Sequence, residues 1–154
     1  MTESTCTSIL YPQDSTPLPK PPPKVQDRNI FDLFSLKEKV CVVTGAARQT
    51  GIGFNAALAY CEAGCKGLAL WDYNDCTEAA EYLTKHYGTK VKTYKVDVTS
   101  SANVKETVDQ VVADFGSIDV FVANAGVAWE TGSIVEDINQ DDKSWHKVID
   151  VDVN

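Results

Sequence analysis

Proline is absent from the sequence after Pro23, and arginine is scarce throughout. All six prolines lie between Pro12 and Pro23, so no proline interrupts a helix or strand in the following residues. The only arginines are Arg28 and Arg48, and the net charge is −8. A nucleic-acid backbone attracts proteins with a basic stripe. We therefore expect no nucleic-acid partner.

Long apolar runs and paired cysteine motifs are missing as well. No stretch approaches the ~20 apolar residues that cross a bilayer, and no basic cluster followed by an apolar stretch marks a secretory signal at the N-terminus. The five cysteines form no Cys-x-x-Cys pair, and no His or further Cys lies near Cys61 and Cys65 to complete a metal site. These absences predict no metal and no membrane contact, and reduced thiols in the cytoplasm.

Residues 1–28 are polar and rich in proline, with Pro17-Leu18-Pro19-Lys20-Pro21-Pro22-Pro23 at their centre. Such a segment stays extended, partly as polyproline II. It could dock in an aromatic groove of a partner, but a disordered leader or an arm packed on a neighbouring subunit is the favoured interpretation. Residues 29–154 are expected to form a separate, partial domain.

Short apolar runs alternate with amphipathic segments after residue 38. Apolar side chains at positions 54, 57, 58 and 61 have helical spacing, and Gly64, Gly88 and Gly116 follow three helical segments. Asp75 and Glu78 have the spacing of a capping box. Strands are expected over residues 39–44, 67–72, 90–96 and 118–123, and helices over 54–61, 75–87, 100–115 and 142–154.

This alternation predicts an α/β fold, a doubly wound parallel sheet of the Rossmann-like type with right-handed crossovers. Helices should cover both faces of the sheet, and the strand order should be 3-2-1-4. We expect the fold to be truncated after the fourth strand and fourth helix. Trp145, Val148 and Ile149 of that helix should then be left exposed.

The stretch from residue 40 to 53 points to a function. An apolar strand ends in Thr44-Gly45, and a loop with two further glycines, Gly51 and Gly53, opens a helix. Gly45 can make the tight turn, Gly51 lets phosphates approach its main chain, and Gly53 lets the helix pack closely on the strand. The helix N-terminus offers N–H groups to a pyrophosphate. The pattern predicts a dinucleotide-binding site.

Asp72 closes the second strand, 27 residues after Gly45. A carboxylate there can accept hydrogen bonds from the adenosine ribose and would repel a 2′-phosphate, which slightly favours NAD over NADP. The alternative is an aspartate that caps a turn at the end of a strand. Arg48 in the loop could reach a 2′-phosphate and keeps NADP possible, or it could be a solvated side chain.

Three further motifs follow in order. They are Val96-Asp97-Val98-Thr99 after the third strand, Asn124-Ala125-Gly126 after the fourth, and Trp145 with Asp150-Val151-Asp152-Val153-Asn154 in the last helix. Together with the glycine loop they resemble the short-chain dehydrogenase/reductase family over about residues 36–154. Finer features, such as Leu33-Phe34-Ser35-Leu36-Lys37 and Asp114-Phe115-Gly116, are similar to the fungal ketose and polyol reductases.

The resemblance implies a role for several residues. Asp97 would bind the adenine amino group with the Val98 backbone beside it, or it could be the N-cap of the following helix. Asn124 and Gly126 would shape the ribose pocket, and the Asn124 side chain would brace the central strands, although Asn is also a turn residue. The expected cofactor-binding residues are Thr44, Gly45, Arg48, Gly51, Ile52, Gly53, Asp72, Asp97, Val98, Asn124, Ala125 and Gly126.

The resemblance also implies the chemistry: reversible reduction of a ketose or similar carbonyl to a polyol with NAD(P)H, by an enzyme that is a homo-oligomer at full length. Asn154 would be a catalytic residue that holds a water in a proton relay. The family also uses a Ser and a Tyr-x-x-x-Lys pair, and this sequence contains no Tyr-x-x-x-Lys. We therefore expect no turnover by these 154 residues. A non-catalytic nucleotide-binding or regulatory fragment and a non-functional remnant are the alternatives.

The glycine loop departs from the family pattern in one respect. Five residues, Ala46 to Thr50, separate Gly45 from Gly51, where the family usually has three. Lengthening a surface loop is cheap, at about 0.6 kcal/mol for each doubling of its length. The fold should tolerate the insertion, but the position of Arg48 is shifted.

Overall fold

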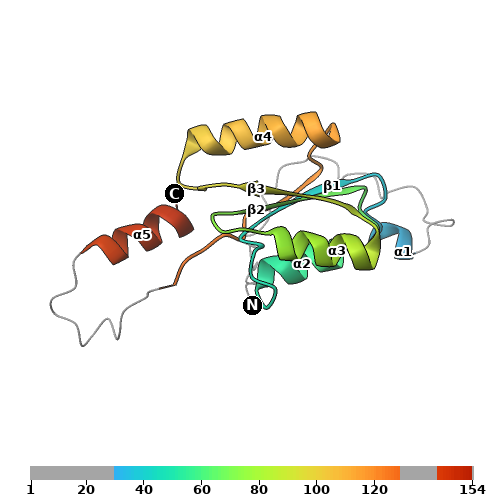
Figure 1. Cartoon of the computed structure of the whole chain (residues 1–154), viewed down its shortest axis with the longest axis horizontal. Helices are drawn as coiled ribbons and strands as arrows, with labels where there is room; N and C mark the ends of the chain where they lie inside the picture. Colours follow the sequence, from blue (N-terminus) through green and yellow to red (C-terminus); the bar gives the residue numbers. More distant parts are fainter. Residues whose placement is uncertain (1–29, 129–141, 154) are drawn as a thin grey trace, which may run out of the picture.

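The computed structural model describes residues 30–128 and 142–153. Figure 1 shows these residues as a sheet with helices on either side. In chain order the elements are α1 (Ile30–Leu33), β1 (Val40–Thr44), α2 (Ile52–Glu62), β2 (Gly67–Asp72), α3 (Thr77–Tyr87), β3 (Lys90–Lys95), α4 (Ser101–Phe115), β4 (Val120–Val122) and α5 (Asp142–Asp152).

All four strands are parallel and lie in the order β3-β2-β1-β4, which confirms the predicted order. Val40 is paired with Gly67 of β2, and Gly67 in turn with Lys90 of β3. On the other side of β1, Cys41 is paired with Val120. Parallel neighbours need a crossover connection, and α2, α3 and α4 provide these connections.

The helices cover both faces of the sheet, as expected for a doubly wound fold. Helices α2 and α3 lie on one face and α4 on the other (Figure 1). Neighbouring residues of a strand point to opposite faces, so β1 contributes to two cores. Cys41 and Val43 belong to the core under α2 and α3, whereas Val42 belongs to the core under α4.

Three helices end at the glycines that the sequence predicted. Gly64, Gly88 and Gly116 follow α2, α3 and α4 and have φ values of 76°, 68° and 94°. One hydrogen bond closes the end of each of the last two helices. Gly88 N donates to Thr84 O at the end of α3, and Gly116 N donates to Val112 O at the end of α4. These left-handed caps satisfy carbonyl groups that the helix itself leaves unpaired.

Two local predictions were wrong, and one short helix was not predicted. The expected capping box is absent, because α3 has Cys76 as its N-cap and Asp75 Oδ1 accepts hydrogen bonds from the backbone and hydroxyl of Thr77 instead. Strand β4 covers only Val120–Val122. The short helix α1 was not predicted, since four residues are too few for a helical pattern to be visible.

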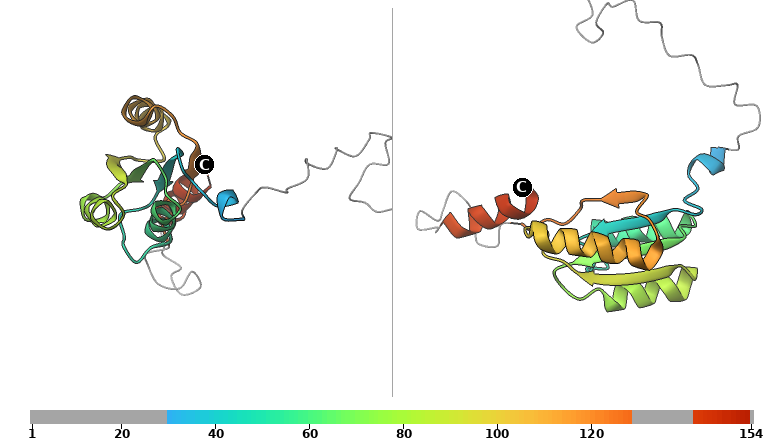
Figure 2. Two further views of the ribbon diagram at one scale, coloured as in Figure 1. Left: turned by 90° about the vertical axis from the view of Figure 1, so that its right-hand side faces the viewer. Right: turned by 90° about the horizontal axis from the view of Figure 1, so that it is seen from above.

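Helix α5 lies beyond the end of the sheet at which the strands finish (Figure 2). Its Asp152 accepts a hydrogen bond from Val127 N at 2.9 Å, so it contacts the segment that follows β4. Trp145 is 52% exposed, as expected. Val148 and Ile149 were expected to be exposed as well, but both are half-buried.

Some predictions concern residues outside the described ranges. The proline-rich segment 1–28, Cys6 and the candidate catalytic residue Asn154 fall there, so their predicted roles stay predictions. Of the helices that the structure describes, none combines the length and the apolar character needed to cross a bilayer.

Candidate cofactor-binding site

The glycine loop joins β1 to α2, at the crossover where the sequence placed it. Gly45 has a φ of +69°, and a Cβ atom there would come within 2.8 Å of Ala125 Cα. Its N–H donates to the carbonyl oxygen of Trp71 at 2.8 Å, which ties the loop to the end of β2. Both the left-handed turn and the close approach of the Asn124–Gly126 segment therefore require glycine.

The other two glycines are needed by packing within the protein. A Cβ at Gly53 would collide with Gly45 O and lie 2.6 Å from Asn124 Nδ2, as expected for close packing of the helix on the strand. At Gly51 a Cβ would lie 2.9 Å from Arg48 O, where Gly51 N already donates to the same oxygen at 2.7 Å. The turn of the loop itself thus requires Gly51, a reason the sequence pattern did not reveal.

The N-terminus of α2 has the character of an anion-binding site. Its N-cap is Gly51, no side chain caps it, and its first turn has no acidic residue. The first N–H groups of an α-helix have no carbonyl partner within the helix, and they carry partial positive charge. The adjacent Ile52 side chain is 83% exposed, so this helix end is open on its outer side.

Asn124 and Thr44 connect β4 to the loop. Thr44 Oγ1 accepts hydrogen bonds from Asn124 N at 2.9 Å and from Ala125 N at 2.8 Å. Asn124 Nδ2 donates to Thr44 O at 2.9 Å and to Gly45 O at 3.3 Å. The bracing of the central strands that the family resemblance implied for Asn124 is present. Any contact of Asn124 with a cofactor stays a prediction.

Asp72 faces the glycine loop, but its carboxylate already has partners. Oδ2 accepts a hydrogen bond from Ala47 N at 2.9 Å. Oδ1 accepts hydrogen bonds from Asn74 N at 2.9 Å and from Asn74 Nδ2 at 3.2 Å. Three N–H groups of this chain therefore surround the carboxylate that was expected to bind a ribose, and the capping alternative describes its present contacts.

Asp97 lies in the loop after β3. Its Oδ1 accepts hydrogen bonds from the Thr99 hydroxyl at 2.7 Å and from Thr99 N at 3.0 Å, which lower the pKa of the carboxyl below its usual value. The N-cap of α4 is Ser100, so the alternative role of Asp97 as that N-cap is wrong. Among the described residues, the second carboxylate oxygen has no hydrogen-bond partner. Its binding to an amino group such as that of adenine stays a prediction.

A cavity of about 280 Å³ connects several of the predicted residues. Thr44, Val98 and Ala125 all line it, although they come from three different strand ends. The other lining residues are Trp71, Val104, Phe121, Ala123, Val151, Asp152 and Val153. The structure thus brings Val98 beside the segment that follows β4. Arg48 lies apart, exposed in the loop, where its Nε donates to Thr50 Oγ1 at 3.2 Å.

Sequence reasoning missed Trp71 in this cavity. Its side chain is 1% exposed and stacks edge-on against Phe121, with ring centroids 5.4 Å apart. The indole Nε1 is buried and has no hydrogen-bond partner among the described residues. A buried donor without a partner is uncommon in folded proteins, although Trp71 is a lining residue of the cavity and its Nε1 atom itself is not exposed. Only the apolar run of β2 signalled that Trp71 would be buried.

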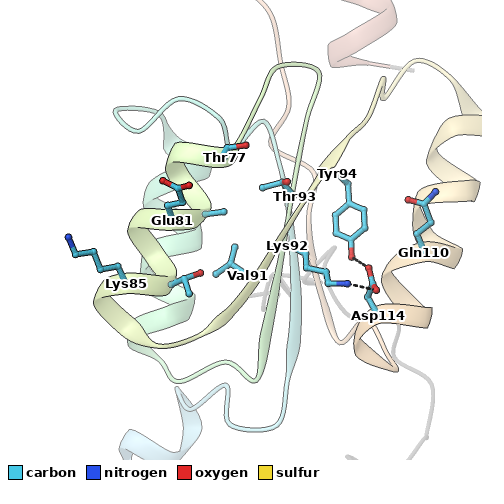
Figure 3. A pocket seen from close by; sticks show the side chains of 11 residues that line it. Thr77, Glu81, Lys85, Val91, Lys92, Thr93, Tyr94, Gln110 and Asp114 are labelled. Carbon is cyan, nitrogen blue, oxygen red and sulfur yellow. Dashed lines mark hydrogen bonds and ion pairs between the residues drawn. The ribbon is translucent and has the colours of Figure 1, made fainter.

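A larger hollow of about 800 Å³ lies at the outer edge of the sheet, between α3, β3 and α4 (Figure 3). None of the predicted cofactor-binding residues lines it, so its size alone does not mark the site. Over the described ranges, no cluster of His, Cys, Asp or Glu could hold a metal ion. The cysteines at positions 41, 61, 65 and 76 are free and buried.

Comparison with known proteins agrees with this geometry. The family model described as enoyl-(acyl carrier protein) reductase matches residues 45–154. This chain belongs to the short-chain dehydrogenase/reductase family. A probable NADP-dependent mannitol dehydrogenase of Yarrowia lipolytica is 44% identical over 146 residues, which are 94% of this chain and 50% of that protein.

Two further relatives agree with this membership. The sorbose reductase SOU1 of Candida albicans is 44% identical over 139 residues, which are 90% of this chain and 47% of that protein. The crystal structure of the NADPH-dependent 3-quinuclidinone reductase from Rhodotorula rubra superposes with a TM-score of 0.70 at 39% identity, covering 88% of this chain and 49% of that one. This chain therefore spans about half the length of the curated relatives it matches.

The slight preference for NAD expected from Asp72 finds no support. The mannitol dehydrogenase and the quinuclidinone reductase carry NADP and NADPH in their names. The structure offers a physical reason, because the oxygens of Asp72 accept N–H groups of the chain itself. A carboxylate with these partners has fewer free acceptor sites, so it can accept fewer hydrogen bonds from ribose hydroxyls than the sequence pattern suggested.

Proposed function

We propose that this short-chain dehydrogenase/reductase binds NADP(H) at the crossover between β1 and α2. The complete protein would interconvert a ketose, or a related carbonyl compound, and the corresponding polyol. The observation that carries the proposal is the uncapped N-terminus of α2, which opens beside the Asn124–Gly126 segment. The relatives of this chain include a mannitol dehydrogenase and a sorbose reductase, which support a polyol or ketose as the substrate.

The residues present fit a dinucleotide. The N–H groups at the start of α2 would receive the diphosphate, and Ile52 would offer an apolar surface beside it. Asp97 and Val98 would hold the adenine, with Ala125 and Gly126 next to its ribose. When bound, the nicotinamide gives or accepts a hydride, while these residues bind and orient the cofactor.

Arg48 would select the phosphorylated cofactor. It is exposed in the loop and makes only one described side-chain hydrogen bond, to Thr50. A guanidinium can bind a phosphate through two parallel hydrogen bonds. The 2′-phosphate of NADP would therefore gain a partner at this loop that the 2′-hydroxyl of NAD would not need.

Titration of the purified protein with NADPH and NADH, followed by tryptophan fluorescence, tests the proposal. We expect NADPH to bind more tightly, and Arg48→Ala to weaken NADPH binding by about tenfold with little effect on NADH. Lys85→Ala removes an exposed cation on α3 and is the matched control. Absence of binding by either cofactor up to millimolar concentration would contradict the proposal.

Further parts of the proposal concern the whole protein. We propose a cytoplasmic homo-oligomer in which residues 29–154 are the cofactor-binding portion of the domain and residues 1–28 are a disordered, proline-rich segment. Because no Tyr-x-x-x-Lys is present, the 154 residues alone should bind cofactor without turnover. Oxidation of sorbitol, mannitol or arabinitol by this chain would contradict that expectation. Binding without turnover in any longer product would favour a regulatory role instead.

A further inference from the structure

The glycine loop is hydrogen-bonded to the end of β2. Two hydrogen bonds join them: Gly45 N donates to Trp71 O at 2.8 Å, and Ala47 N donates to Asp72 Oδ2 at 2.9 Å. The first bond joins two main-chain groups and does not depend on the identity of the side chains. The second depends on the Asp72 carboxylate, so it is the bond that a substitution at position 72 would remove.

The solvent exposure of the loop changes at Ala47, the residue whose N–H donates to Asp72. Ala46 is fully buried and Ala47 is half-buried, whereas Arg48, Gln49 and Thr50 are all exposed. The chain then returns through the hydrogen bond from Gly51 N to Arg48 O. Asp72 therefore marks the boundary between a part of the loop fixed to the core and an exposed part that contains Arg48.

The carboxylate has little capacity left for a ribose. Two carboxylate oxygens offer about four acceptor sites, and three N–H groups from Ala47 and Asn74 occupy three of them. A ribose that used both hydroxyl groups as donors would have to displace one of these bonds. If it displaced that from Ala47, the loop under the diphosphate would lose its support.

We infer that Asp72 is a positioning residue, which holds Ala47 and thereby sets the shape of the loop that receives the diphosphate. It does not choose between NAD and NADP through the ribose. The inference rests on the proposed function, since a bound dinucleotide is what the loop would position. It assigns to Asp72 an effect on both cofactors, because the diphosphate is common to them.

Substitution of Asp72 separates positioning from ribose recognition. With Asp72→Ala, we expect the affinities for NADPH and NADH to fall together by about tenfold, with their ratio changed by less than about threefold. The backbone amide of Ala47 should lose its protection from hydrogen exchange in the unliganded protein. Asp75→Ala is the matched control, because the Asp75 carboxylate accepts hydrogen bonds from Thr77 in its own turn, and the substitution should leave both affinities unchanged.

Asp72→Asn provides a second variant should the alanine variant fail to fold. An amide keeps the shape but replaces one acceptor oxygen by a donor, so both affinities should fall together by a smaller factor. Loss of NADH affinity alone, tighter binding of NADPH, or no change in either affinity would overturn the inference while the proposed function stands. If the unsubstituted protein binds neither cofactor, the proposed function fails and the inference with it.

Discussion

Thr44 and Asn124 hold each other in a reciprocal pair. The Thr44 hydroxyl accepts a hydrogen bond from Asn124 N at 2.9 Å, and the Asn124 amide returns one to Thr44 O at 2.9 Å. The same hydroxyl donates to Val122 O at 3.3 Å. The two residues are 80 positions apart in the chain. Their pairing fixes the end of β1 against the end of β4, where the candidate cofactor site lies.

Replacing Thr44 by valine tests this pair. The valine side chain has nearly the same shape, but it leaves the N–H groups of Asn124 and Ala125 without their acceptor. A fully buried N–H left unpaired costs about 1–3 kcal/mol, and these two are part-buried, so the free energy of unfolding in a urea titration should fall by about 1–3 kcal/mol in total. Thr44→Ser retains the hydroxyl and should stay close to the unsubstituted protein. Equal losses in the two variants would contradict a role for the hydroxyl.

Gly53→Ala should destabilise the protein even though alanine favours helices. The added Cβ would meet the Gly45 carbonyl and Asn124 Nδ2, and a backbone carbonyl cannot move aside easily. Overpacking of this kind costs about 1–3 kcal/mol, measured as a lower free energy of unfolding. Gly126→Ala is the comparison, because its Cβ would lie 3.4 Å from the Asp152 carboxylate and the side chain can yield. A stabilised Gly53→Ala variant would show that the helix and loop are not closely packed.

A carboxylate at the outer edge of the sheet should make stability depend on pH. Asp114 accepts hydrogen bonds from Lys92 and Tyr94 of β3 (Figure 3), which lower the pKa of its carboxyl. A carboxyl with a lowered pKa stabilises the folded state above its unfolded pKa of about 3.9. That contribution is lost as the pH falls through the lower, folded pKa.

We therefore expect Asp114→Asn to be less stable than the unsubstituted protein near pH 7, with the difference shrinking as the pH falls below about 4. Thermal unfolding of both proteins from pH 7 to pH 2 measures this difference. Asp109→Asn removes an exposed partner of Lys105 on the same helix and should have a small effect throughout. A difference independent of pH would contradict the assigned ion pair.

The buried cysteines should resist alkylation in the folded protein. A hydrogen bond with Cys41 is the main cause that raises the pKa of Cys65 to about 11, and burial raises the pKa of Cys76 to about 12. The pKa of Cys61 is raised as well, mainly by a hydrogen bond with Cys65. Cys41 has a lowered pKa but is fully buried. Burial therefore limits reaction at all four cysteines, and a small thiolate fraction limits it further at Cys61, Cys65 and Cys76.

Mass spectrometry after iodoacetamide treatment at pH 8 should find positions 41, 61, 65 and 76 unmodified in the folded protein. The same positions should be modified in guanidinium chloride. Rapid labelling of Cys65 without denaturant would show that this part of the core opens readily.

The order of elements was predictable because it depends on local pattern. Apolar runs of five or six residues and helical spacing such as that of Phe54 and Ala57 identify strands and helices wherever they occur. The glycines at positions 45, 51 and 53 identify the loop, since a left-handed turn and close packing exclude side chains. The strand order followed from the general behaviour of parallel α/β sheets.

The contacts of the candidate site were decided by tertiary structure. The sequence indicated that Asp72 would lie at the loop, but only the pairing of β1 with β2 places its carboxylate against Ala47 N. Likewise Trp71 of β2 and Phe121 of β4 meet because both strands pair with β1 in the sheet, and both side chains line one cavity. The spacing of apolar residues in the sequence indicates which face of a helix or strand is buried. It carries no information about partners tens of residues away, which the packing of the whole sheet selects.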